Sequence, residues 1–210
     1  MTRNFRILLI LVICVSASGA EEKDAGISNE TPQQRIPGSK YSSIREVDFR
    51  NTPILPIDSG SGNGSTWPAL KDGRFRRDSK VAKKNSHSGD DIAIEAVGYL
   101  PAKSVREYAL VRLRYTTWFG SSSSEGQVLV VGLDDTGHPI ICQRIEYNLR
   151  GADEDEAWAH FDPAKKRLVV SAVHGWEHCC PRERIVITFE WSGEKFVPVG
   201  RKIFSLRHPQ

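Results

Sequence analysis

The feature that most constrains the fold of this chain is an alternation of apolar and polar residues with a period of two. In the stretch "RIVITFEW", residues 184–191, every second residue is large and apolar: Ile185, Ile187, Phe189 and Trp191. Successive side chains of a β-strand point to opposite faces, so this pattern predicts a strand with one buried face. The stretch "YALVRLRYTTWF", residues 108–119, has the same alternation and predicts a second strand.

Further strands are expected where β-branched residues cluster. "QVLVVGL" at 127–133 and "RLVVSAV" at 167–173 predict strands buried on both faces, and "SGDDIAIEAVGYL" at 88–100 predicts another strand. Turn signals separate these stretches: "KDG" at 71–73, "GSSSSEG" at 120–126, "DDTGHP" at 134–139, "DPAKK" at 162–166 and "SGEK" at 192–195. Residues 67–206 are therefore expected to form one all-β domain, an antiparallel meander that makes a sandwich or a partly closed barrel.

The chain begins with the pattern of a signal peptide. Arg3 and Arg6 precede an apolar run at residues 7–15, and the small residues Ser18 and Ala20 mark a cleavage site after Ala20. The run is too short for a transmembrane helix, which needs about 20 apolar residues. We expect an exported protein, periplasmic or secreted, with no transmembrane span in the mature chain.

The segment that follows, residues 21–66, has the composition of a disordered linker. It is polar, contains four prolines and ends in "SGSGNGS" at 59–65. Such a composition buries too little apolar surface to offset the entropy lost on ordering. We therefore expect a flexible tether between the signal peptide and the β-domain.

The charge of the chain argues against nucleic acid as a partner. The full sequence has a net charge of +3, from 29 basic and 26 acidic residues. Removal of residues 1–20 takes away Arg3 and Arg6, which leaves the mature chain near neutrality. No strong affinity for a polyanion follows from such a charge.

Cysteines indicate one covalent crosslink. Cys14 leaves with the signal peptide, so the mature chain keeps Cys142, Cys179 and Cys180. In an oxidising compartment, this odd number predicts one disulfide and one remaining thiol. The residues leave two pairings open. Cys179 can pair with Cys180, although neighbouring Cα atoms, about 3.8 Å apart, are closer than in most disulfides; alternatively, Cys142 pairs with one of the two.

The stretch "HGWEHCC", residues 174–180, also suggests a metal site. His174 and His178, with the thiolate of Cys179, are ligand types that suit zinc or copper. However, the spacing of the histidines brings their side chains together only on a helix, and this stretch lies between two predicted strands. We expect no cofactor, and instead a ligand-binding face formed by His174, Trp176 and His178.

The order of these stretches resembles a known family. "LKDGRF", "YALVRLRY", "VLVVGLDDTG", "RLVVSAV" and a Cys-Cys-Pro motif before "RIVITFEWSGEKFVPV" are similar to a family of uncharacterised secreted bacterial β-domain proteins, over residues 67–200. The motif here is Cys179-Cys180-Pro181. The resemblance implies export and a β fold, and it implies no established activity. Because the family is marked by this motif and not by a cysteine at position 142, it favours the bond between Cys179 and Cys180.

No catalytic constellation is recognisable in the sequence, and the Gly-x-Ser-x-Gly elbow of many hydrolases is absent. We therefore expect an exported, non-catalytic, monomeric β-domain that binds an envelope component or a protein partner. Two alternatives stay open. One is a metal-binding protein that uses His174, His178 and the adjacent cysteines Cys179 and Cys180. The other is a hydrolase whose carboxylates come from separate strands, an arrangement that sequence spacing does not reveal.

Overall fold

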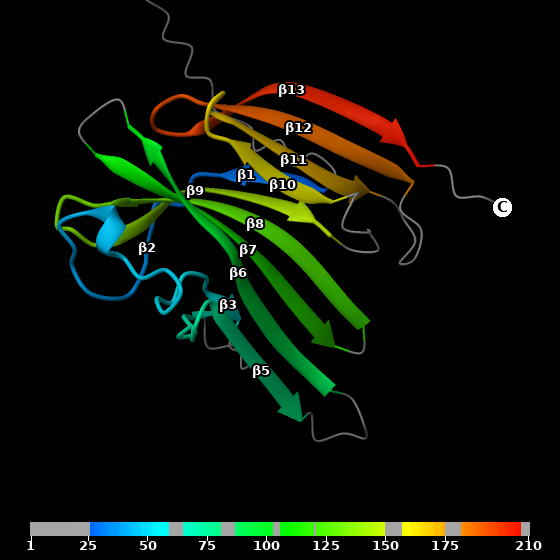
Figure 1. Ribbon diagram of the computed structural model, residues 1–210. Coiled ribbons are helices and arrows are strands. Elements are labelled where there is room, and N and C mark those ends of the chain that lie inside the picture. Colours follow the sequence, from blue (N-terminus) through cyan, green and yellow to red (C-terminus); the bar gives the residue numbers. More distant parts are fainter. Residues whose placement is uncertain are drawn as a thin grey trace, which may run out of the picture.

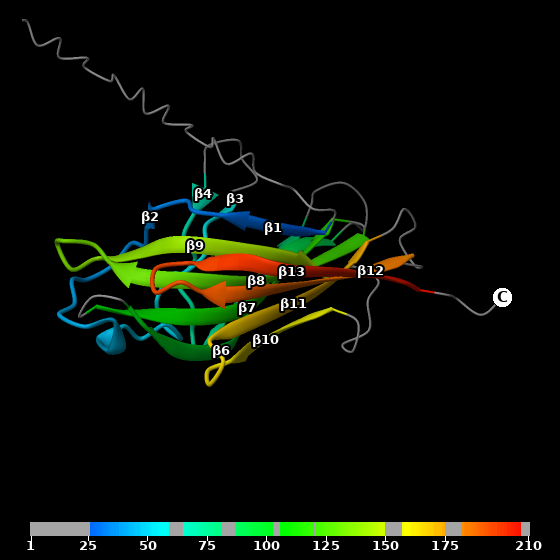
Figure 2. The ribbon, with the colours of Figure 1, turned by 90° about the horizontal axis from the view of Figure 1, so that it is seen from above.

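A computed structural model of the chain describes residues 26–58, 65–80, 87–102, 106–119, 121–149, 157–174 and 182–206. These residues form two large antiparallel β-sheets that lie one over the other (Figures 1 and 2). The sheets are not closed into a barrel. The predicted all-β sandwich is thus confirmed.

The larger sheet has the strand order β1-β9-β8-β7-β6-β5, and β2 also pairs with β9. Its strands are β1 (Ile27–Glu30), β2 (Gln34–Arg35), β5 (Arg74–Lys80), β6 (His87–Pro101), β7 (Glu107–Phe119), β8 (Ser121–Leu133) and β9 (Pro139–Asn148). Consecutive strands from β5 to β9 are neighbours, as a meander requires. The strands predicted at 88–100, 108–119 and 127–133 lie within β6, β7 and β8.

One predicted loop is a strand. The stretch "GSSSSEG" was expected to be a turn, but residues 121–126 belong to β8, and Ser121 pairs with Phe119 of β7. The partner segment of β7 contains the β-branched residues Thr116 and Thr117, which favour an extended backbone. The hydroxyl groups of Thr116 and Ser124 lie 3.0 Å apart across the two strands. This cross-strand pairing extends the hairpin to its tip.

The smaller sheet has the order β10-β11-β12-β13. Its strands are β10 (Trp158–Asp162), β11 (Arg167–His174), β12 (Glu183–Trp191) and β13 (Phe196–Ser205). The remaining elements are a 3-10 helix, η1 (Ile44–Glu46), and a short pair, β3 (Ile57–Asp58) with β4 (Ser65–Thr66). The alternation that predicted a strand at 184–191 is confirmed, because the apolar residues of β12 are buried at every second position.

Two apolar cores lie on opposite faces of the larger sheet. The first lies between the sheets and joins residues such as Val128, Val130 and Ile145 of the larger sheet to Val170, Ile185 and Phe189 of the smaller sheet. The second core includes Leu129 and Val131, the alternate residues of β8. The prediction that β8 is buried on both faces is therefore confirmed.

The N-terminal segment covers the second core, so the linker predicted over residues 21–66 is wrong for residues 26–58. This segment contributes β1 and β2 to the sheet edge, and Ile36 and Ile54 are fully buried. Its mean composition is polar, but apolar residues occur at irregular intervals along it: Ile27, Ile36, Ile44, Val47, Phe49, Ile54, Leu55 and Ile57. A segment that wraps over a sheet needs no regular period, so composition alone did not identify it. Residues 21–25 and 59–64 lie outside the described residues.

The described part of the chain has no helix long and apolar enough to cross a membrane. The predicted signal peptide, residues 1–20, lies outside the described residues.

Candidate functional site

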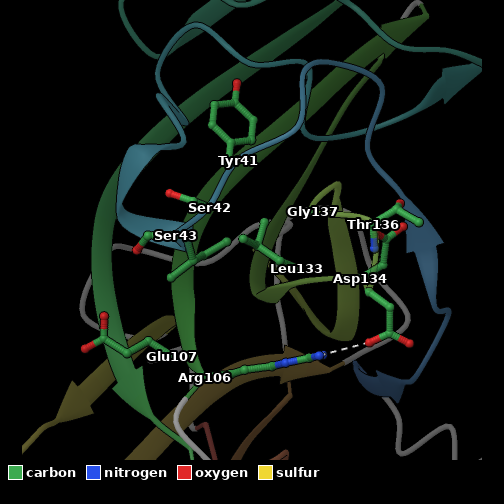
Figure 3. A pocket seen from close by; sticks show the side chains of 11 residues that line it. Tyr41, Ser42, Ser43, Arg106, Glu107, Leu133, Asp134, Thr136 and Gly137 are labelled. Carbon is green, nitrogen blue, oxygen red and sulfur yellow. Dashed lines mark hydrogen bonds and ion pairs between the residues drawn. The ribbon is translucent and has the colours of Figure 1, made fainter.

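A pocket of about 610 Å³ lies at the end of the larger sheet where β7 begins and β8 ends. Its lining residues come from three segments: Tyr41, Ser42, Ser43 and Ile44; Arg106 and Glu107; and Leu133, Asp134, Asp135, Thr136 and Gly137. Figure 3 shows Leu133 in the middle, with Ser43 and Glu107 on one side and Asp134 and Thr136 on the other. The last segment, which the sequence predicted only as a turn, is confirmed as the turn of the β8–β9 hairpin.

A backbone hydrogen bond and a buried side chain hold the N-terminal segment beside this hairpin. The backbone N–H of Tyr41 donates to the carbonyl oxygen of Gly137 at 2.8 Å, and Ile44 is buried in the second core. Gly137 has a φ of 84°, and a Cβ atom there would lie 2.7 Å from the carbonyl oxygen of Tyr41. Only glycine fits this left-handed, closely approached position. The pocket therefore exists because the N-terminal segment folds onto the sheet.

Asp134 holds the hairpin in shape. Its Oδ1 atom accepts hydrogen bonds from the N–H of Thr136 (2.8 Å), the hydroxyl of Thr136 (2.7 Å) and the N–H of His138 (3.0 Å). Its other oxygen accepts from Arg35. These bonds, that of the Thr136 hydroxyl first, hold the pKa of Asp134 well below its usual range. Asp134 is therefore a structural carboxylate and a very weak base.

The other charged groups of the pocket are paired with one another or with close neighbours. Arg106 lies 2.9 Å from Asp135, and Glu107 accepts two hydrogen bonds from Arg45, at 2.6 and 2.9 Å. The hydrogen bond from Arg45 lowers the pKa of Glu107. Exposed pairs of this kind add little to stability, but they leave the walls close to neutral while keeping many donors and acceptors.

The serines of the pocket hold the start of η1: Ser43 is its N-cap, and the hydroxyl oxygen of Ser43 accepts from the N–H of Arg45 at 3.3 Å. The hydroxyl of Ser42 donates to Glu46 at 2.7 Å, and Glu46 also accepts from the N–H of Ser42 at 3.0 Å. These bonds lower the pKa of Glu46. A carboxylate with a lowered pKa removes a proton poorly at neutral pH. Glu46 is therefore a weak base.

A second hollow, of about 500 Å³, adjoins the first and shares Arg106, Glu107, Leu133, Asp134 and Asp135 with it. Cys142 of β9 lines this hollow as a half-buried free thiol. Burial raises the pKa of the thiol, which keeps it protonated and poorly nucleophilic. The alternative bridge from Cys142 to Cys179 or Cys180 involves partners that lie outside the described residues.

Of the other residues singled out in the sequence, only His174 is described. It ends β11 and pairs in register with Glu183 of β12. Trp176, His178, Cys179 and Cys180 lie outside the described residues, so the predicted bond between Cys179 and Cys180 and two of the three residues of the predicted ligand-binding face lie there as well. Within the described ranges, no three His, Cys, Asp or Glu side chains gather closely enough to hold a metal ion.

Glu125 of β8 and Glu146 of β9 are a pair of carboxylates from neighbouring strands, as the hydrolase alternative requires. Burial first, and then the negative charge of Glu146, raise the pKa of Glu125. Glu146 accepts hydrogen bonds from Ser28 (3.3 Å) and Gln127 (3.2 Å), which tie it to the strands on either side. Neither glutamate lines the two hollows described above, so this pair is not part of the candidate site.

No protein-family model, curated protein or solved structure matches the chain. The resemblance to secreted bacterial β-domain proteins therefore stays a prediction, and the site has to be interpreted from its own geometry.

Proposed function

We propose that the chain is an exported, non-catalytic β-sandwich that binds a neutral, hydroxyl-rich component of the cell envelope, a glycan, in the pocket at the β8–β9 hairpin. The observation that carries the proposal is the pairing of the charges. Arg106 with Asp135 and Arg45 with Glu107 neutralise each other, so the walls favour no ion. They present donors and acceptors side by side, which suits sugar hydroxyl groups.

The apolar parts of the pocket support a sugar as the ligand. Leu133, in the middle of the view in Figure 3, contributes apolar surface between the polar walls, and Tyr41 is among the residues that line the same hollow. Aromatic and aliphatic surface with a few oriented polar groups is the usual composition of a site for a small ligand. Leu133 offers apolar surface, and Arg106 with Asp135 offers hydrogen-bond donors and acceptors beside it.

Replacing Arg106 with Ala is expected to weaken binding of a neutral oligosaccharide by about tenfold, since a hydrogen bond to a charged group contributes about 1.5 kcal/mol or more. Isothermal titration with tetra-N-acetylglucosamine measures the affinity. The matched control is Arg76→Ala, which removes a similarly exposed arginine paired with Asp78 outside the pocket. An Arg106→Ala protein that binds the sugar as tightly as the unaltered protein would contradict the proposed site, and so would an unaltered protein that does not bind.

The proposed export has a separate test. Mass spectrometry of the protein from its own organism is expected to find an N-terminus at Glu21, because small residues at Ser18 and Ala20 are what the processing enzyme accepts. Ala20→Tyr places a large side chain at that site and is expected to leave residues 1–20 attached. A native protein that begins at Met1, or that carries a lipid on Cys14, refutes cleavage after Ala20.

A further inference from the structure

The edge strand β13 carries an unusual amount of exposed apolar surface. Among the described residues, all the exposed large apolar side chains lie on this strand: Val197, Val199, Ile203 and Phe204, each between 39 and 52% exposed. β13 is the last strand of the smaller sheet, so one of its edges has no neighbouring strand among the described residues. An exposed apolar edge is a template for pairing with another strand.

The hydrogen bonds at the two ends of β13 show which backbone groups point outward. The N–H of Leu206, just after the strand, donates to Arg182 on the β12 side at 2.7 Å. Backbone groups of alternate residues point to opposite edges. The N–H and C=O groups of Phe204 and Lys202 therefore point to β12, while those of Ile203 and Ser205 point away from the sheet.

The first half of this outer edge is already blocked. The side-chain amide of Gln143, from the larger sheet, donates to the carbonyl oxygen of Phe196 at 2.8 Å and accepts from its N–H at 2.7 Å. Pro198 has no N–H to offer, and the register of β12 with β13 shifts next to it. Proline and bulges are common protections of an edge strand. The blocked part ends at the shift, and residues 201–205 lie beyond it.

We propose that a second copy of this chain pairs with residues 201–205, antiparallel about a two-fold axis at Ile203. In this register Ile203 lies opposite Ile203 of the second copy. The outward N–H and C=O groups of Ile203 and Ser205 then form hydrogen bonds with the second copy. Two side chains that are each 50% exposed become buried against each other. The smaller sheets of the two copies then form one continuous sheet. This proposal replaces the monomer expected from the sequence, and it is independent of the glycan site.

Charge favours this register over the two on its N-terminal side. With the axis at Ile203, Lys202 of one copy lies beside Phe204 of the other, where a cation is attracted to an aromatic ring. Phe204 already accepts such a contact within its own chain, from the guanidinium of Arg184 at 4.8 Å from the ring centre. An axis at Arg201 or at Lys202 would place like charges directly opposite each other, which disfavours pairing.

Sedimentation velocity over the micromolar range tests the proposal, and the unaltered mature chain is expected to shift from monomer to dimer as its concentration rises. Ile203→Lys places two cations at the axis and is expected to give a monomer throughout. The matched control is Val199→Lys, which makes the same change at an equally exposed residue in the blocked half, and it is expected to dimerise normally. Ile203→Pro removes an N–H that points away from β12 and that no described strand uses, and it is also expected to be monomeric.

Thermal melting shows whether each variant is folded, so a misfolded protein is not mistaken for a monomer. An unaltered chain that stays monomeric at every concentration overturns the proposal. This holds even if the edge of β13 pairs with a different polypeptide, because the proposal names a second copy as the partner. A dimer that survives in Ile203→Lys but is lost in Val199→Lys overturns it as well, because the interface would then lie in the first half of β13.

Discussion

A chain that begins at residue 67 is expected to be unfolded, or to lose its cooperative melting transition. Deleting residues 21–66 uncovers one whole face of the larger sheet, including Ile92, Leu113 and Leu129, which are inaccessible to solvent in the intact protein. The deleted segment also buries eight large apolar side chains of its own. Each fully buried side chain of this kind stabilises the fold by about 1.5–3 kcal/mol. Losing this burial together with the cover of the second core is expected to remove most of the stability of a domain, which is about 5–15 kcal/mol.

Circular dichroism and thermal melting of the chains that begin at residues 21 and 67 measure this effect. A point variant gives the same test without a deletion: Ile54→Asp buries a charge in the second core and is expected to destabilise the protein severely. Val199→Asp makes a comparable change at a side chain that is 52% exposed, and it is expected to alter the melting temperature little. If the chain from residue 67 melts like the longer chain, the N-terminal segment is the tether that its composition suggested.

The strands of both sheets could be predicted from the sequence because each depends on a local pattern. The alternation of Ile185, Ile187 and Phe189 in β12 depends only on the two faces of one strand. The run at 127–133 was likewise predicted to be buried on both faces, and this is correct. That prediction already required something to cover each face of β8. The smaller sheet supplies one cover, and the second had to come from a segment classified as a linker.

The candidate site could not be predicted in the same way, because its residues belong together only after folding. Tyr41 and Gly137 are far apart in the chain, and they meet because the segment before η1 turns back across the end of the sheet. No spacing in the sequence signals that contact. Gly137 was the one local clue, as part of a predicted turn, but a turn residue does not show what approaches it. The cysteine and histidine cluster, by contrast, was conspicuous in sequence and lies mostly outside the described residues.

Gly126 is a position where a very small substitution is expected to have a large effect. It pairs in register with Tyr147, and a Cβ atom at Gly126 would lie 2.0 Å from the Cζ atom of that ring. The ring cannot move aside easily, since Tyr147 is 3% exposed within the first core. Burial of the phenol raises its pKa to about 12, in keeping with the same confinement. A glycine inside a strand that allows such a close approach has a packing role.

Gly126→Ala is therefore expected to destabilise the protein by about 3 kcal/mol, at the upper end of what overpacking usually costs. Urea unfolding followed by fluorescence measures the change. The control is Gly98→Ala, a glycine in β6 with no atom within 4 Å of the added methyl group, which is expected to change stability by less than about 1 kcal/mol. Tyr147→Ala destabilises the core itself, but in that background Gly126→Ala is expected to cost little more, because the ring is gone. If Gly126→Ala costs the same with and without the ring, the clash with Tyr147 is not the reason that glycine occupies this position.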